Sequence, residues 1–373
     1  MRKVFLVANS PFTILNFRKE LIKEFKRKGF AVYVLFPDST DLMSAHACQD
    51  VIRELGCECI HIPLSRNGMN PKDDLVLVMF LRKIFKREKP DLVMNYTIKA
   101  TIYSSIAARL SGVRNIYSNI TGLGYVFIGM DLKTKVLRLF IKNLYKFSLS
   151  FNKKVFFQNP DDRALFNKFG MCKLDKSVLI NGSGVDTAHL KRSSTNRNYK
   201  KFLFVGRILK DKGVVEYINA ARILKKEYPD TEFALAGAFD SNPSAISKQQ
   251  ISEYEQEGVI KYLGVTSDIK GLLNEYGVFV LPSYREGTPR STLEAISMSM
   301  PVVTTNVPGC KETVIEGYNG FLVDPKSAND LARGLSCILE HDDFDLLANN
   351  SRKLAVEKFD VHNVNGNILD VVL

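Results

Sequence analysis

Two short segments in the C-terminal half combine cations, carboxylates and glycines at points where strand-like runs end. In the first, VGRILKDKG (205–213), an apolar run leads into Gly206 and Arg207, and a polar turn then leads to Lys212. A planar guanidinium and a flexible ammonium can bind one diphosphate, and Gly206 would let the backbone approach it. Surface turns with Arg and Lys are common, so this segment alone favours a structural interpretation.

The second segment, SYREGTPRSTLEA (283–295), predicts a turn followed by a helix. Thr288 and Pro289 are typical of an N-cap and a first helical residue. The free N–H groups of a helix N-terminus attract anions, and Arg290 adds a positive charge there. This segment therefore also predicts an anion site.

Two carboxylates accompany that helix, Glu286 in the turn and Glu294 within the helix. Carboxylates would not bind phosphate, but they accept hydrogen bonds from sugar and ribose hydroxyls. A capped helix with a solvated glutamate explains the segment alone equally well. Both segments follow strands of one predicted domain, and ligands of α/β sheets bind beyond the carboxyl ends of the strands. Together the two segments therefore favour a ligand site.

Strand-like apolar runs alternate with amphipathic stretches along the whole chain. Such a pattern predicts parallel sheets covered by helices on both faces. The predicted strands are 4–8, 31–36, 58–62, 91–95, 115–119, 154–158, 202–206, 233–237, 260–264, 278–282 and 301–305. The polar segment 191–201 is typical of a linker. We therefore expect an α/β protein of the GT-B kind, with two doubly wound Rossmann-like domains facing across a cleft.

The expected domains are residues 1–195, which would face the acceptor and the membrane, and residues 196–373, which would bind the donor. The last helix is a candidate to cross back to the first domain. The chain has 373 residues and 45% hydrophobic content, enough for two cores. No apolar run reaches the roughly 18–20 residues of a membrane span. We interpret the N-terminal MRKVFLVANSPF as a buried strand instead of a signal peptide.

Six cysteines without a CxxC motif do not indicate a disulfide framework, and a reduced cytoplasm fits them better. His46, Cys48, Cys57, Cys59 and His61 are close enough in sequence to raise the possibility of zinc. The last three alternate as in a strand, however, and the first two fall on a predicted helix. We expect no metal there.

The charge is divided unequally. The net charge is +12, with +16 in residues 1–195 and −4 in residues 196–373. A basic half favours an anionic partner, either nucleic acid, an anionic membrane surface or a phosphate-bearing substrate. The segment 133–154 predicts a basic amphipathic helix suited to a membrane interface, with Lys135, Arg138, Lys142 and Lys146 as its cations. A solvated face of a core helix is the alternative.

The two C-terminal segments resemble the donor site of glycosyltransferase family 4, with its Gly-Arg…Lys-Gly loop and its Glu-x7-Glu pair. The similarity spans essentially the whole chain and includes FR (17–18), KATIYSSIAARLSGV (99–113), TGLGYVF (121–127), FFQNPDDRALF (156–166), NGSGVDTAHL (181–190), SDIKGLLNEYGVFVLPSYREG (267–287) and PVVTTNVPGCKETVIEGYNGFLVDP (301–325). The first half resembles the branch acting on undecaprenyl-diphosphate-linked sugars, especially its α-1,3-N-acetylgalactosaminyltransferases.

The resemblance implies a role for each of the residues singled out above. Arg207 and Lys212 would hold the donor diphosphate, and Glu294 would hold the ribose. Glu286 would lie beside the donor sugar, and with Arg207 and Lys212 it forms the expected catalytic set. The other expected donor-binding residues are Gly206, Leu263 and Gly264 near the uracil, and Gly287, Thr288, Pro289 and Arg290.

The resembled family is retaining and metal-independent, because cations and the helix terminus neutralise the charge that a divalent ion neutralises elsewhere. No cofactor is then expected, and the UDP-sugar is a co-substrate. Asp161 and Asp162 are interpreted as acids at a helix N-terminus instead of metal ligands. No residue stands out as a covalent nucleophile, so front-face displacement is expected.

The expected acceptor contacts are Arg18, Lys99, Thr121 and Gly122. Relatives often carry a histidine in the turn after the fourth strand, where this chain has Ile98. The neighbouring Lys99 remains, but a lysine does not titrate near neutrality. It would therefore take the place of a possible proton relay through histidine.

These observations favour a glycosyltransferase that moves a sugar from a UDP-sugar to a polyprenyl-diphosphate-linked acceptor. We expect the sugar to be an N-acetylhexosamine and the product to belong to the biosynthesis of a surface glycan or a glycoprotein oligosaccharide. It would be cytoplasmic and peripherally bound to the inner face of the cell membrane. A non-hydrolysing UDP-N-acetylglucosamine 2-epimerase shares the two-domain architecture and is the alternative. A nucleic-acid-binding protein is a remote third, because the aromatic residues fall within apolar strands and not on a basic surface.

Overall fold

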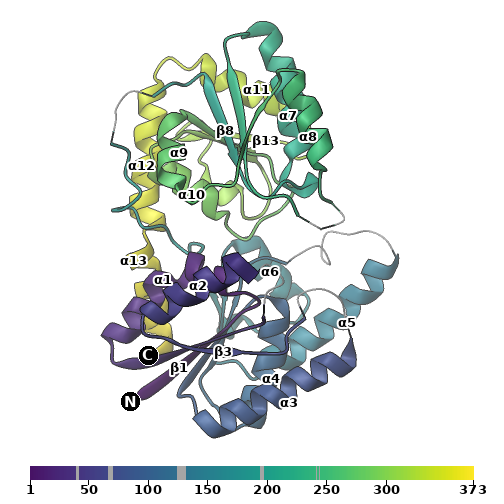
Figure 1. Ribbon diagram of the computed structural model, residues 1–373, viewed down its shortest axis with the longest axis vertical. Helices are drawn as coiled ribbons and strands as arrows, with labels where there is room; N and C mark the ends of the chain where they lie inside the picture. The colour runs from purple at the N-terminus through teal and green to yellow at the C-terminus, as the bar shows by residue number, and fades with distance from the viewer. Residues whose placement is uncertain (39–41, 66–69, 124–131, 194–196, 241, 243) are drawn as a thin grey trace. The chain divides into compact units, whose positions relative to one another are not determined.

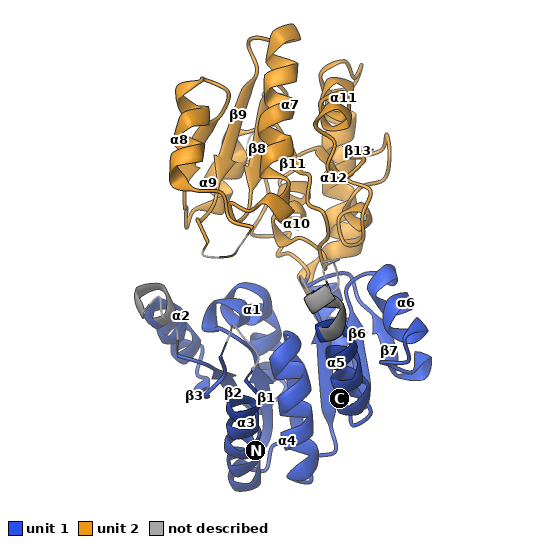
Figure 2. Cartoon of the chain, turned by 90° about the vertical axis from the view of Figure 1, so that its right-hand side faces the viewer, with its two compact units in different colours: residues 1–183, 362–373 blue, residues 184–361 orange. Residues whose placement is uncertain are grey.

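The computed structural model describes the chain apart from residues 39–41, 66–69, 124–131, 194–196, 241 and 243 (Figure 1). For residues 42–45 and 132–136 only the backbone is described. The chain forms two compact units, residues 1–183 with 362–373, and residues 184–361 (Figure 2).

The first unit is built on a parallel sheet in the order β3-β2-β1-β4-β5-β6-β7. Its strands are β1 (Arg2–Val7), β2 (Phe30–Phe36), β3 (Glu58–His61), β4 (Leu92–Tyr96), β5 (Ile116–Ile120), β6 (Lys154–Phe157) and β7 (Ser177–Leu179). The first six were predicted. The edge strand β7 was not, because its three residues include only two apolar ones.

Helices cover both faces of this sheet. They are α1 (Pro11–Arg27), α2 (Leu42–Glu54), α3 (Pro71–Glu88), the π-helical turn η1 (Ala100–Ser104), α4 (Ser105–Leu110), α5 (Leu132–Leu149), α6 (Pro160–Lys168), the 3-10 turn η3 (Leu174–Lys176) and α13 (Val361–Val372). One buried cluster joins the sheet to α3, α4 and α5. A second cluster joins the opposite face to α1 and α13, through Val364, Ile368 and Leu369.

The second unit is built on a parallel sheet in the order β10-β9-β8-β11-β12-β13. Its elements are β8 (Lys201–Val205), η4 (Lys210–Lys212), α7 (Val214–Glu227), β9 (Glu232–Ala236), α8 (Lys248–Gln256), β10 (Lys261–Gly264), α9 (Ile269–Glu275), β11 (Val278–Leu281), α10 (Arg290–Ser297), β12 (Val302–Thr305), η5 (Lys311–Thr313), β13 (Gly320–Val323), α11 (Ala328–Leu339) and α12 (Phe344–Phe359). β13 was not predicted.

The prediction of two Rossmann-like α/β domains is confirmed. The chain changes unit at 183/184, however, and not at 195/196 within the polar segment. Val185 already pairs with Asp360 of the second unit, and Arg192 donates to the carbonyl of Leu273 at 2.7 Å. These contacts make the predicted linker part of the second unit.

The expected helix 133–154 is α5, which ends earlier, at Leu149. None of the helices in the described part of the chain combines the length and the hydropathy that crossing a membrane requires.

Candidate active site

The strand order of the second unit reverses between β8 and β11. The chain runs outward from β8 through β9 to β10, and then returns to the other side of β8 as β11. Ligands of open α/β sheets bind at such a reversal, beyond the carboxyl ends of the strands. The segment 206–213 leaves β8 at this point and the segment 282–289 leaves β11, so the topology brings the two sequence segments together.

Lys212 and Glu286 form an ion pair across these two segments. The side chains are 21% and 13% exposed, so both are partly shielded from water. Ser283 donates its hydroxyl to the same carboxylate oxygen at 2.8 Å, and the Glu286 amide donates to the carbonyl of Pro308 at 3.0 Å. Lys212 and Ser283 thus hold the carboxylate of Glu286, and the loop at Pro308 holds its backbone.

Two glycines permit this close approach of the loops. Gly213, with φ +76°, caps the N-terminus of α7, and a Cβ there would lie 2.2 Å from the carbonyl oxygen of Pro282. Gly309, with φ +88°, would place a Cβ 2.3 Å from the carbonyl oxygen of Glu286. Any side chain at either position would push apart the segments that carry Lys212 and Glu286.

Glu294 lies inside α10, where Arg290 donates to its carboxylate at 2.8 Å. Burial raises the pKa of the Glu294 carboxyl, and Arg290 acts in the opposite direction. Arg290 also donates to the carbonyl of Gly184 at 2.7 Å. The cation predicted at the N-terminus of α10 is therefore engaged by a carboxylate and a carbonyl of the protein.

The helix start differs from the prediction. Pro289 is the N-cap with φ −70° and ψ 119°, and α10 begins at Arg290 without a side-chain cap. Thr288 was predicted as the cap, but it lies one residue before the N-cap. Gly287, Thr288 and Pro289 are buried.

Arg207 and Lys212 have different partners. Arg207 is 57% exposed and donates to Asp240 at 2.8 Å, whereas Lys212 pairs with Glu286. The two cations expected to bind one diphosphate are therefore each paired with a different carboxylate. Gly206 is packed closely, because a Cβ on the neighbouring Gly237 would lie 1.7 Å from the Gly206 carbonyl oxygen.

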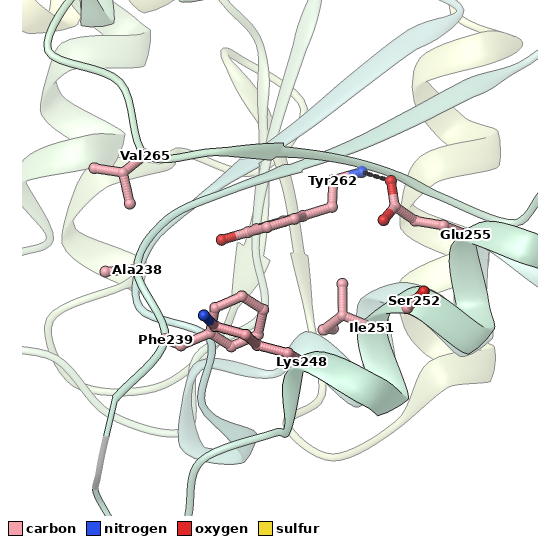
Figure 3. A pocket seen from close by; sticks show the side chains of 8 residues that line it. All are labelled: Ala238, Phe239, Lys248, Ile251, Ser252, Glu255, Tyr262 and Val265. Carbon is pink, nitrogen blue, oxygen red and sulfur yellow. Dashed lines mark hydrogen bonds between the residues drawn. The ribbon is translucent and has the colours of Figure 1, made fainter.

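Leu263 and Gly264 lie at the end of β10, and both are half-buried. Gly264 has φ +73° and open space at its Cβ position. An open cavity of about 530 Å³ lies beside this strand, and Figure 3 shows Tyr262 and Phe239 on its wall. Leu263 and Gly264 do not line that cavity, whose lining is Ala238, Phe239, Lys248, Ile251, Ser252, Glu255, Tyr262 and Val265.

The sheet of the first unit has its own reversal, between β1 and β4. Ser10 caps α1 directly after β1, accepting from the Thr13 amide at 3.1 Å. After β4, Thr97 has φ +73°, which is uncommon for a residue other than glycine, and a π-helical turn begins at Ala100. Strained turns and π-turns cluster at functional sites, so this turn is the equivalent candidate position in the first unit.

Two of the expected acceptor residues, Arg18 and Lys99, lie beside that turn. Arg18 is 3% exposed, and its guanidinium lies 4.5 Å from the ring centroid of Tyr96. Lys99 donates to Asp74 at 3.1 Å. Ile98 packs against the buried cluster of α3 and α4, so its side chain serves the core.

Thr121 and Gly122 follow β5, and Gly122 has φ +138°. Both are half-buried.

The cations expected on α5 differ in exposure. Lys146 is exposed, but Lys142 is half-buried, with its ammonium 3.2 Å from the ring centroid of Phe169. Arg138 is half-buried as well. The side chain of Lys135 lies outside the described part of the structure.

The possible zinc ligands do not assemble in the described residues, which contain no group of three or more His, Cys, Asp or Glu able to hold a metal. His61 contacts Asp38 and lies 3.2 Å from the amide nitrogen of Gln49. Asp161 and Asp162 lie in the first turn of α6, as predicted.

Three contributors to the site were missed by the sequence analysis: Ser283, Asp240 and the turn at Pro308 and Gly309. The Pro-Gly pair after a strand signals a tight turn, but only the tertiary structure shows that it meets Glu286. Near this turn, burial raises the pKa of the Cys310 thiol to about 12, so this cysteine is protonated at neutral pH.

Comparison with known proteins gives matches over both units. Residues 3–159 match the family described as glycosyl transferase 4-like, and residues 186–354 match glycosyl transferases group 1. The N,N'-diacetylbacillosaminyl-diphospho-undecaprenol α-1,3-N-acetylgalactosaminyltransferase of Campylobacter jejuni is 29% identical over 95% of this chain and 94% of its own length. The UDP-Gal:α-D-GlcNAc-diphosphoundecaprenol α-1,3-galactosyltransferase of Escherichia coli is 25% identical over 77% and 76%.

Solved structures share the fold across the chain. Anabaena Alr3699/HepE in complex with UDP has a TM-score of 0.77 with 20% identity, covering 100% of this chain and 99% of that one. Sucrose-phosphate synthase from Thermosynechococcus elongatus has a TM-score of 0.80 with 18% identity, covering 100% and 98%.

Proposed function

Because the chain belongs to glycosyltransferase family 4 and is a glycosyltransferase of the GT-B fold, we propose that it transfers an N-acetylhexosamine from a UDP-sugar to a polyprenyl-diphosphate-linked acceptor. The product would be an intermediate of a surface glycan or a glycoprotein oligosaccharide. The names of the Campylobacter and Escherichia relatives support the acceptor class, since both contain diphospho-undecaprenol or its synonym. The matches to two glycosyltransferase families and to named glycosyltransferases favour this proposal over the epimerase alternative.

The observation that carries the proposal is the Lys212–Glu286 pair at the reversal between β8 and β11. A donor diphosphate placed there would compete with Glu286 for the Lys212 ammonium. Glu286 would then be free to accept hydrogen bonds from the donor sugar, while Ser283 still holds one of its oxygens. Arg207 would exchange Asp240 for a phosphate oxygen, and Glu294 would accept from the ribose hydroxyls.

We propose a retaining front-face displacement. An acceptor hydroxyl forms the new bond to the anomeric carbon on the face from which the diphosphate leaves. The bond between that carbon and the diphosphate oxygen breaks, and the hydroxyl proton passes to the leaving oxygen. Lys212, Arg207 and the N-terminus of α10 stabilise the charge that develops on the diphosphate, which makes a divalent ion unnecessary in this scheme.

A donor screen tests this function. The purified protein is incubated with a panel of UDP-sugars and a detergent extract of lipid-linked saccharides, and lipid-linked product is measured by mass spectrometry. Transfer from a UDP-N-acetylhexosamine with retention at the anomeric carbon is the expected result. Isomerisation of the UDP-sugar without an acceptor, or no lipid-linked product from any donor, would contradict the proposal. Loss of transfer in EDTA, restored by a divalent ion, would contradict its metal-independent part.

The proposed place of action is the inner face of the cell membrane. A lipid-linked acceptor remains in the bilayer, so the enzyme must reach it from the surface. The excess of positive charge in residues 1–195 supports an anionic surface as the partner.

A further inference from the structure

Helix α3 presents a stripe of apolar side chains to solvent. Leu75, Val76 and Met79 are 63%, 57% and 52% exposed. With Phe80 they line an open groove of about 690 Å³. The core uses the opposite side of the helix, where Leu77, Leu81 and Phe85 are buried, so the exposed stripe faces away from the core.

Basic residues continue this stripe along the same helix. Arg82, Lys83 and Lys86 follow Met79 at spacings of three to seven residues and line the same groove. Among the described residues of the groove, none is acidic. An apolar stripe next to exposed cations fits the interface of an anionic bilayer, where apolar groups enter between the head groups and cations meet lipid phosphates.

α3 has two exposed cations beside its apolar stripe, whereas among the described side chains of α5 only one cation, Lys146, is exposed. Lys83 and Lys86 are exposed, whereas Lys142 of α5 lies over the ring of Phe169. α5 also exposes apolar residues, among them Leu139 at 63%, which makes it a matched comparison for Leu75.

We propose that α3 docks the enzyme on an anionic phospholipid bilayer, with Leu75, Val76 and Met79 inserted and Lys83 and Lys86 on lipid phosphates. The inference rests on the proposed function in that a lipid-linked acceptor requires contact with the bilayer. It also connects that surface to the candidate acceptor site. Asp74, adjacent to Leu75, accepts from Lys99 at 3.1 Å and from the Tyr103 hydroxyl at 2.6 Å.

This connection fixes Lys99 relative to the docking surface. Asp74 is 7% exposed, and its two carboxylate oxygens are each taken by one of those donors. An acceptor whose lipid chain lies in the bilayer beside α3 would therefore have its diphosphate close to an ammonium held at a fixed depth.

Vesicle flotation of the full-length protein tests the docking. Vesicles of phosphatidylcholine alone are compared with equimolar phosphatidylcholine and phosphatidylglycerol. The Leu75→Gln/Met79→Gln variant should bind the anionic vesicles at least about tenfold more weakly than the wild type. The Lys83→Gln/Lys86→Gln variant should lose about fivefold for each charge, and only with the anionic vesicles.

The Leu139→Gln/Phe147→Gln variant is the matched control on α5, and it should bind within about twofold of the wild type. Unchanged thermal unfolding of every variant shows that the fold is intact. The proposal is overturned if the α3 variants bind anionic vesicles as strongly as the wild type does. It is also overturned if the α5 control loses as much binding as the α3 variants. Transfer by the wild-type enzyme in detergent micelles is measured separately, so a failure of the proposed function there is distinguished from a failure of docking.

Discussion

Two glutamate–cation pairs in the second unit are built in different ways. Lys212 and Glu286 are separated by 74 residues and meet only because the sheet places β8 beside β11. Arg290 and Glu294 lie four residues apart in one helix, so helical geometry alone brings them together. The first pair therefore depends on the tertiary fold and the second on local structure.

The two carboxylates are exposed to a similar extent, 13% for Glu286 and 12% for Glu294. Their surroundings differ. Glu286 is held at the meeting point of three loops, beside the expected position of the donor sugar, whereas Glu294 is held within a helix beside the expected ribose. The proposed function therefore predicts that the first pair governs the chemical step and the second governs donor binding.

The largest effect is expected for Glu286→Gln. Glutamine keeps the size of the side chain and can still accept from Ser283, but it loses the charge that steers the donor sugar. We expect kcat to fall by about 10²–10³-fold while the KM for the donor changes less than about threefold. Initial rates over a range of UDP-sugar concentrations measure both constants. A variant with the kcat of the wild type would remove Glu286 from the chemical step.

Lys212→Met should reduce kcat/KM for the donor by about 10²-fold, because the diphosphate loses a cation and Glu286 loses its partner. Lys210→Met, an exposed lysine of the same turn, is the matched control and should stay within about twofold. The double variant Lys212→Met/Glu286→Gln should be less impaired than the two single losses multiplied. Purely multiplicative losses would show that the two side chains act independently.

Glu294→Gln should raise the KM for the donor about tenfold and leave kcat within about twofold. The reason is that a neutral amide is a weaker acceptor for the ribose hydroxyls than a carboxylate. Glu275→Gln, an exposed glutamate of the same unit, serves as the control. A fall in kcat with an unchanged KM would reverse the division of roles between Glu286 and Glu294.

The smallest effect concerns stability. The pKa of Glu294 is raised in the folded state, chiefly by burial, so the folded chain holds this proton more tightly than the unfolded chain. The stabilisation is complete below the unfolded pKa of about 4.3 and is lost as the pH rises through the folded pKa. The free energy of unfolding of the wild type should therefore fall, relative to that of Glu294→Gln, as the pH increases. Urea unfolding of both proteins at a series of pH values measures this difference. A wild type that becomes more stable relative to Glu294→Gln as the pH rises would contradict the burial effect.

Much of the fold follows from the sequence, because nearly continuous apolar strands leave few alternatives to a parallel sheet covered on both faces. The exceptions have physical reasons. β7 is only three residues long, and β13 begins with Gly320 immediately after a turn. Neither has an apolar run long enough to stand out.

The candidate site was predictable in its residue types but not in its contacts. The sequence placed Lys212 and Glu286 at strand ends, but it did not show that Ser283 and the Pro308 carbonyl hold Glu286 and its backbone. It did not show that Arg207 pairs with Asp240. Such pairings depend on side-chain reach between loops, which spacing along one segment does not determine.

The last helix, α13, makes the first unit discontinuous in the gene. Val364, Ile368 and Leu369 pack against the apolar face of the β1 sheet, so a fragment that stops at residue 183 would expose that face and self-associate. Both termini belong to the same unit. A circular permutant that links Leu373 to Met1 and opens the chain before α13 would therefore encode each unit as one uninterrupted segment, and would allow the two halves of the enzyme to be produced and studied separately.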